Sequence, residues 1–471
     1  MSKQTIIAAI EKAKDDLIRI AEELWKNPEL SHEEKESSAL QKKYLKEAGF
    51  RIKELDDIQQ YAFTAEWGSG SPVIGLLGEF DALPGLSQKV QTTREAVVPG
   101  GPGHGCGHNL LGTTLLGAAL GVKAAIDAGQ ISGTIRYFGA PAEEQLGKPI
   151  LAKAGVFNGL DAVFGYHPAD LNTVAAFGTN ASILLSLAFH GAASHAAQVP
   201  HLGRSSLDAL TLTQVGIEFL REHVPPTARM HYIVTSGGER ANIVPDFASG
   251  EFQIRAPSMG ELIPILKRAL DVANGAALMT GTRAEFKIKY GCYNVIPNRA
   301  LSDVLYENLK AIDPPDYTRE ELDYCRKLSD TMTEDQKRNT LLNLGVDAAS
   351  VEALLPDAIH EGKGYWGWGW TIPASTDVGD VSHLSPTAQV YTATYPLGIG
   401  SHTWQATSAS GSTIGMKGMI YGAKIFGSAC FDLFTKPEII KAAKLEWEKT
   451  LKGERYVAAE DLLSQIAKSG Q

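Results

Sequence analysis

Cysteine is scarce in this sequence, with four residues among 471, and these are scattered along the chain. Such spacing excludes the dense disulfide framework that stabilises small secreted proteins. The apolar start of the chain is short and is followed directly by charged residues, so no secretory leader is expected. These features predict a reducing, cytoplasmic environment with free thiols.

A surplus of positive charge is also missing. The net charge is −10, whereas a nucleic-acid partner requires a basic surface. No segment approaches the roughly 18 uninterrupted apolar residues that a membrane-spanning helix needs. We therefore expect neither nucleic acid nor a membrane as a partner.

The sequence does have the composition of a globular protein, and its length is enough for two domains. Three apolar runs, at 72–80, 133–141 and 161–168, are typical of strands buried on both faces, and a helix-forming stretch separates the first two. Residues 31–50 predict a further helix, capped by Ser31. The predicted fold class is α/β, a mostly parallel sheet with helices on both faces.

A different pattern occupies residues 181–291, where strands and helices alternate in the order β-α-β-β-α-β. This is the order of a ferredoxin-like α+β domain. We predict it to be inserted into a discontinuous catalytic domain formed by residues 1–180 and 292–471. Residues 300–360 are charged and helix-prone, which indicates a helical elaboration of the catalytic domain.

Each of the three predicted strands ends in side chains capable of acid–base or metal chemistry. These are Glu79 and Asp81, then Glu143 and Glu144, then His167. In open α/β sheets, ligands bind at the carboxyl ends of the strands. We therefore expect these side chains to meet at one edge of the sheet.

The glycine-rich stretch 101–112 adds His104, Cys106 and His108 to the same region. It could be a coordination site, a cysteine–histidine nucleophile pair or a local bias of composition. Side chains two residues apart in a loop rarely form an oriented nucleophile and base, and no third orienting group is evident. Coordination is therefore the favoured interpretation for Cys106 and His108, and His104 is expected to be a loop residue behind them.

A site for two divalent ions needs histidine, carboxylate and sometimes cysteine ligands, together with a free carboxylate as base. The candidate ligands are Cys106, His108, Glu144, His167 and His402. Glu143 is the candidate base, because adjacent carboxylates after a strand can point in different directions.

Six short motifs occur in an order that resembles a known superfamily. They are EFDALP, HGCGHN, PAEE, GYHP, SHAA and GIGSHT. This order is similar to that of the aminoacylase, dipeptidase and glutamate carboxypeptidase superfamily of co-catalytic metallopeptidases. The Cys-Gly-His version resembles its amidohydrolase branch, which includes auxin-conjugate and hippurate hydrolases. The resemblance spans nearly the whole chain, including the inserted domain.

The resemblance implies a metal-dependent amidohydrolase that cleaves N-acyl amino acids such as aminobenzoyl-glutamate. It implies two divalent ions, Zn, Mn or Co, held by the five candidate ligands, with Glu143 as general base. Asp81 would hold a ligand histidine without binding the ion itself, and so fix the tautomer of that histidine. His195, in the inserted domain, would stabilise the tetrahedral intermediate in the partner subunit's site, and Asn242 would bind substrate.

Other interpretations stay open at this point. A role for His195 across subunits implies a homodimer, with the inserted domain as lid and dimerisation domain, although a heteromer with a related chain is possible. A dipeptidase of the same superfamily, a cysteine hydrolase and a non-catalytic partner subunit are the alternative functions. Glu79 stands where classical members of the superfamily carry a histidine, which the amidohydrolase branch also lacks, and it is either a sixth ligand or structural. Asn109 replaces the aspartate of many branch members, which puts a bridging role there in doubt.

Overall fold

The computed structural model of the chain describes residues 3–343, 361–366 and 368–469, and it divides into two compact units. The large unit comprises Met1–Phe177, Ile296–Trp370 and Val381–Arg455, and the small unit comprises Gly178–Val295, Thr371–Asp380 and Tyr456–Gln471. The small unit thus extends the predicted 181–291 by a few residues at each end and contains two further segments, Thr371–Asp380 and Tyr456–Gln471. They are attached by hydrogen bonds from the Tyr456 hydroxyl to Asp380 (2.8 Å) and from the Val457 amide to the Tyr293 hydroxyl (3.2 Å).

The large unit is built on an eight-stranded sheet in the order β1-β2-β4-β3-β5-β14-β6-β12. In that order the strands are Arg51–Glu54, Phe63–Gly68, Thr134–Gly139, Val73–Gly78, Ala162–Ala169, Thr387–Ala393, Asn172–Ala175 and Glu361–Trp366. The four central strands, β4, β3, β5 and β14, are parallel to one another. Strands β1, β2 and β6 pair antiparallel with their inner neighbours, so the sheet is mixed and mostly parallel at its centre. The three predicted apolar runs are the central strands β3, β4 and β5.

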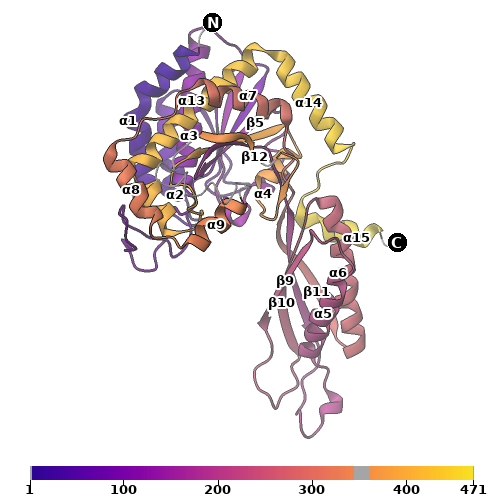
Figure 1. Cartoon of the computed structure of the whole chain (residues 1–471). Helices are drawn as coiled ribbons and strands as arrows, with labels where there is room; N and C mark the ends of the chain where they lie inside the picture. Colours follow the sequence, from indigo (N-terminus) through magenta and orange to yellow (C-terminus); the bar gives the residue numbers. More distant parts are fainter. Residues whose placement is uncertain (1–2, 344–360, 367, 470–471) are drawn as a thin grey trace. The chain divides into compact units, whose positions relative to one another are not determined.

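The large unit contains the helices α1 (Gln4–Lys26), α2 (Lys35–Glu47), α3 (His108–Asp127), α4 (Lys148–Lys153), α7 (Arg299–Ala311), α8 (Arg319–Ser329), α9 (Glu334–Asn343), α12 (Trp404–Ser410), α13 (Thr413–Thr435) and α14 (Pro437–Leu451). Helices α2, α3, α7 and α13 contact strands of this sheet, whereas α1, α12 and α14 pack on other helices of the large unit (Figure 1). Helices α7, α8 and α9 form the described part of the predicted helical elaboration, and residues 344–360 lie outside the described residues. The predicted cap at Ser31 is wrong: α2 begins at Lys35, and the Ser31 hydroxyl donates to Asp81 instead.

Helix α3 is the centre of the core, since it packs against α1, α13 and strands β3, β4 and β5. By length and composition alone it could cross a membrane, but 78% of its most apolar window is buried within the fold. A Cβ atom on Gly112 would lie 2.7 Å from the carbonyl oxygen of Glu79. This glycine therefore allows the N-terminal part of α3 to approach the end of β3 closely.

The small unit follows the element order that the sequence predicts. Its elements are β8 (Ala181–His190), α5 (Ser206–Arg221), β9 (Arg229–Ser236), β10 (Phe247–Ala256), α6 (Met259–Thr280) and β11 (Arg283–Cys292), with the short strands β7 (Gly178–Thr179) and β13 (Thr371–Ile372) and the terminal helix α15 (Leu462–Ser469). Four strands form an antiparallel sheet in the order β11-β8-β10-β9. Helices α5 and α6 pack together on it (Figure 1). The short helix α11 (Val378–Ser382) contains the point in the sequence at which a segment of the small unit ends, at Asp380, and the large unit resumes, at Val381.

All four cysteines are buried and free. A cytoplasmic location stays a prediction from the sequence.

Candidate metal centre

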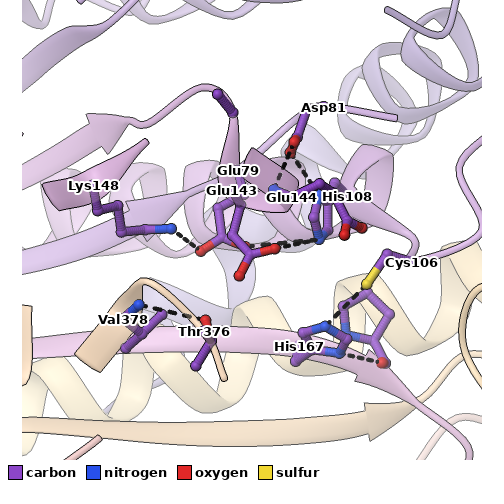
Figure 2. Close-up of polar contacts among 12 residues, drawn as sticks. Glu79, Asp81, Cys106, His108, Glu143, Glu144, Lys148, His167, Thr376 and Val378 are labelled. Atoms are coloured by element: carbon purple, nitrogen blue, oxygen red, sulfur yellow. Dashed lines mark hydrogen bonds and ion pairs between the residues drawn. The ribbon is translucent and has the colours of Figure 1, made fainter. Parts of the chain in front are cut away.

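The predicted site residues of the large unit meet where the central parallel strands end. Glu79 and Asp81 follow β3, and Glu143 and Glu144 begin a single 3-10 turn after β4. His167 lies near the end of β5, and His402 follows β14. Cys106 and His108 stand at the start of α3, against these strand ends. Figure 2 shows Glu79, Glu143 and His108 converging, with Cys106 and His167 beside them.

Cys106 and His167 form the first pair of donors. The sulfur lies 3.3 Å from Nε2 of His167, and Nδ1 of the same ring is 2.7 Å from the carbonyl oxygen of Pro168. The carbonyl can only accept, so Nδ1 carries the hydrogen. Nε2 therefore faces the sulfur, donating to it when the ring is protonated and offering its lone pair to a cation when the ring is neutral. Burial opposes ionisation of Cys106, but positive charge on His167 and His108 outweighs it and holds the pKa of the thiol well below its ordinary value. A thiolate and an imidazole therefore face the same point.

His108 is the second donor centre. Its Nδ1 lies 2.8 Å from Oδ1 of Asp81, so Nδ1 carries the hydrogen that the carboxylate accepts. Its Nε2 is fully buried, makes no hydrogen bond to any described residue, and lies 3.8 Å from Oε2 of Glu79 and 3.9 Å from Oε2 of Glu143. Burial alone would raise the pKa of Asp81, but His108 and the hydrogen bonds to the carboxylate lower it to about 2. Asp81 is thus an ionised support for the ring.

His402 and Glu144 form a third group with Cys106. Nε2 of His402 is 3.4 Å from Oε1 of Glu144, and one donor atom of each of the three residues lies within 4.8 Å of the others. The His402 amide donates to the carbonyl oxygen of Gly105 (2.9 Å), which attaches its loop to the Cys106 loop. Hydrogen bonds to Cys106 and Glu144 raise the pKa of His402 to about 10. The cluster is therefore anionic enough to hold protons on its histidines.

The arrangement fits bound cations better than it fits hydrogen bonding. Protein ligands of one ion each lie about 2.0–2.3 Å from it, and so about 3–4 Å from one another. The separations of 3.8 and 3.9 Å around His108 are too long for hydrogen bonds but lie in that range. Nε2 of His108 is buried without a hydrogen-bond partner in the part of the chain that the structure describes, and Oε1 of Glu144, also buried, has only the 3.4 Å ion-pair contact with His402. A divalent cation would satisfy both atoms and compensate the negative charge.

Comparisons with known proteins agree with this geometry. Residues 75–467 match peptidase family M20/M25/M40. The chain belongs to the M20 family. It is therefore a metallohydrolase that acts on amide bonds, as the sequence motifs imply.

Several relatives of this M20 chain cover nearly its full length. A subunit of the p-aminobenzoyl-glutamate hydrolase of Escherichia coli (strain K12) is 37% identical over 95% of each chain. The Xaa-Arg dipeptidase of Homo sapiens is 29% identical over 96% of this chain and 93% of its own. Among solved structures, a dinuclear metal-binding M20 peptidase of Bacillus subtilis has a TM-score of 0.60 at 19% identity, covering 90% of this chain and 99% of its own. An aminobenzoyl-glutamate utilization protein of Klebsiella pneumoniae has a TM-score of 0.59 at 16% identity, covering 91% of this chain and 98% of its own. These two structures share its fold.

The turn that carries Glu143 in this M20 centre is held by two acidic side chains from outside the predicted ligand set. Oε1 of Glu34 accepts a hydrogen bond from the Ala142 amide (2.6 Å), and Oδ2 of Asp81 accepts one from the Glu144 amide (2.9 Å). Ala142 has a φ of +62°, a left-handed conformation that needs such support. Burial, followed by the charge of Asp81, raises the pKa of Glu34 to about 8. The sequence offers no sign of this role, because Glu34 lies among other charged residues.

Lys148 is a second residue that sequence reasoning missed. Its side chain is completely buried, and its Nζ lies 2.5 Å from Oε1 of Glu79 (Figure 2). It stands in the first turn of α4, just after the turn that carries Glu143. A lysine near a helix start is usually exposed, so only the fold reveals that this one faces the M20 centre.

His104 and Asn109 serve the packing around the centre. Nε2 of His104 is 3.1 Å from the carbonyl oxygen of Leu24, and burial lowers the pKa of His104 to about 4, so the ring is neutral. The Asn109 amide group donates to the carbonyl oxygens of Ala21 (3.2 Å) and Ser410 (3.1 Å). These bonds join the start of α3 to α1 and α12.

His195 and Asn242 lie together in the small unit, both exposed. Nδ1 of His195 accepts hydrogen bonds from the amides of Ala197 and Gln198, each at 3.2 Å, so in the neutral ring Nε2 carries the hydrogen. The Ala196 amide donates to the carbonyl oxygen of Asn242 (3.0 Å). The two loops therefore present an imidazole N–H donor beside the predicted substrate-binding asparagine.

Asp81→Asn should weaken cation binding by about 10- to 100-fold, which is typical for residues that orient a ligand histidine. The carboxylate accepts from His108, from the Glu144 amide and from the Ser31 hydroxyl (2.7 Å). An amide cannot accept on both ends, so the variant loses the His108 or the Glu144 contact. Titration calorimetry of the metal-free protein measures the effect. Ser31→Ala, which removes one donor only, is the control, and equal affinities in all three proteins would contradict the role of Asp81.

Asp170→Asn should stabilise the protein above pH 7. Oδ2 of Asp170 accepts from the Gly398 amide (2.8 Å) in the loop before His402, and burial raises the pKa of Asp170 to about 7. A raised pKa means that the folded state binds the proton more tightly than the unfolded state does. Protonation of Asp170 therefore contributes in full to the free energy of unfolding below about pH 4, and this contribution is lost as the pH rises through 7. Asparagine keeps the oxygen without the charge. The melting temperature of Asp170→Asn should exceed that of wild type at pH 8, and the two melting temperatures should converge near pH 4. Asp57→Asn, at an exposed position, should show no such trend.

Proposed function

We propose that this chain hydrolyses the amide bond of N-acyl amino acids with an aromatic acyl group, such as aminobenzoyl-glutamate. Two divalent ions, Zn, Mn or Co, would be held by Cys106, His108, Glu144, His167 and His402. The observation that carries the proposal is the cluster of five donors centred on Cys106 and His108, with a further carboxylate, Glu143, directed at it. The p-aminobenzoyl-glutamate hydrolase subunit of Escherichia coli, similar over nearly the whole chain, supports the substrate class.

The chain's own residues then have distinct tasks. When bound, the two ions supply Lewis-acid activation of water and of the substrate carbonyl. Glu143 takes the proton of the attacking water and later gives it to the nitrogen of the leaving amine. His195 donates its Nε2 hydrogen to the carbonyl oxygen as negative charge develops there, and Asn242 binds the substrate beside it. Asp81 keeps His108 in the tautomer that presents Nε2.

We further propose that the small unit is a lid and dimerisation domain. Strand β9 is an edge of its sheet and exposes Ile233 and Val234, with 59% and 48% of their surfaces accessible. An edge strand with apolar side chains is suited to pairing with another strand. In a homodimer, His195 would serve the site of the other subunit. Because one relative is named as a subunit of its enzyme, a heteromer with a related chain is the alternative assembly.

A dipeptidase is the second candidate function. Xaa-Arg dipeptidases of mouse and human are 28% and 29% identical to this chain over nearly their full lengths. The same centre would serve both reactions, since each cleaves an amide next to a free carboxylate. The difference would lie in the groups that surround the substrate side chain.

Elemental analysis combined with a substrate panel tests the proposal. The purified chain, loaded in turn with Zn, Mn and Co, should contain close to two ions and hydrolyse aminobenzoyl-glutamate faster than N-acetyl amino acids. Faster cleavage of dipeptides ending in arginine would favour the dipeptidase. Two bound ions without any turnover would indicate a partner subunit that needs a related chain, and absence of bound ions would refute the proposal.

A further inference from the structure

A buried ion pair stands at the border of the candidate metal centre. Nζ of Lys148 is 2.5 Å from Oε1 of Glu79, and the two side chains are 0% and 5% exposed. An ammonium group is stable in such a place only when its charge is compensated. Glu79 provides that compensation with one of its two oxygens.

The other oxygen of Glu79 points toward the metal centre. Oε2 lies 3.8 Å from Nε2 of His108, the buried atom that has no hydrogen-bond partner among the described residues. Glu79, His108 and Glu143 each contribute one donor atom to a group whose members all lie within 4.8 Å of one another. The 3.8 Å between Oε2 of Glu79 and Nε2 of His108 is again too long for a hydrogen bond and is right for two ligands of one ion. Lys148 occupies one side of the carboxylate and leaves the other side available.

We infer that Glu79 is a sixth protein ligand of the two-cation centre, held by Lys148 so that only Oε2 is free to bind an ion. The inference rests on the proposed function, because it needs the cations. With Glu79 as a ligand, the centre has two unlike cation positions. One is bordered by the thiolate of Cys106, and the other by the carboxylate oxygen of Glu79. Oxygen-rich positions suit harder ions such as Mn, whereas thiolate suits Zn. Lys148 also offsets the charge of one carboxylate among several.

Two substitutions with different expected effects on cation binding test this inference. Glu79→Gln removes the charge of the ligand and should weaken one of the two Mn or Co sites by at least tenfold, while the other keeps its affinity. Lys148→Met releases the second oxygen of Glu79 and should leave Mn binding unchanged or tighten it. A pair that only supports the fold would shift both variants in the same direction. Glu66→Gln, which breaks the ion pair with Arg136 between β2 and β4, is the matched control.

The measurements are titration calorimetry of metal-free protein and the rise in melting temperature on adding Mn or Co. With Co bound, the sulfur-to-metal absorption band from Cys106 should persist in Glu79→Gln, which assigns the weakened site to the oxygen-rich position. If Glu79→Gln does not fold, Glu79→Asp keeps the charge, shortens the reach and should weaken the same site. Two ions bound with wild-type affinity in both Glu79 variants would overturn the inference alone. A wild-type chain that binds no ion would overturn the proposed function with it.

Discussion

Glu143→Gln is expected to lower kcat by a factor of about 10²–10⁴ while both cations stay bound, which is the usual range for loss of a positioned general base. The substitution keeps the shape of the side chain but removes its capacity to accept a proton. Oε2 of Glu143 lies 3.9 Å from Nε2 of His108, at the edge of the donor cluster, with 14% of its side chain accessible. A carboxylate in this place can reach a water at the centre and still exchange its proton.

Glu144→Gln is the matched control, because it changes the neighbouring residue in the same way. Glu144 lies with Cys106 and His402, so its loss should remove a cation together with turnover. Elemental analysis and steady-state kinetics on the two variants separate the roles. Full activity of Glu143→Gln would refute the assignment of the base. Loss of an ion in Glu143→Gln with retention of both in Glu144→Gln would mean that the two glutamates have exchanged roles.

The central strands could be predicted because their sequence has few alternatives. A parallel strand buried on both faces must be mostly apolar, as β3, β4 and β5 are apart from Thr134 and Arg136 in β4 and His167 near the end of β5. The edges could not be predicted in the same way, because a short half-exposed strand such as β1 depends on the partner it meets. The segments Thr371–Asp380 and Tyr456–Gln471 join the small unit through contacts distant in sequence, which no local pattern encodes.

The residues of the site that could be predicted differ in the same way from those that were missed. Strand ends in a parallel sheet must share an edge, so Asp81, Glu143 and His167 could be brought together from the sequence. Glu34 and Lys148 have no such link, because their importance comes from being buried beside the centre. A charged residue in a helical stretch predicts an exposed side chain, and only the packing of the chain reverses that expectation.

Cys106→Ala should lower turnover by more than about a hundredfold and remove at least one cation, since the thiolate belongs to two of the donor groups. Chelation of the wild type should have a similar effect, and adding back Zn, Mn or Co should restore it. A cysteine hydrolase built on Cys106 and His108 would instead resist the chelator and lose activity on alkylation.

Cys106→Asp distinguishes these mechanisms most sharply. A carboxylate can replace a thiolate as a ligand, particularly for Mn, but it is a far weaker nucleophile than a thiolate toward an amide carbonyl. We expect Mn-loaded Cys106→Asp to recover part of the turnover that Cys106→Ala loses, with two ions bound. The pairing of Cys106 with His167, at 3.3 Å, would serve a nucleophile as well as a ligand. Turnover that returns in Mn-loaded Cys106→Asp therefore assigns Cys106 and His167 to coordination. If Cys106→Asp and Cys106→Ala are equally inactive while both ions are bound, the pair is instead assigned to nucleophilic attack.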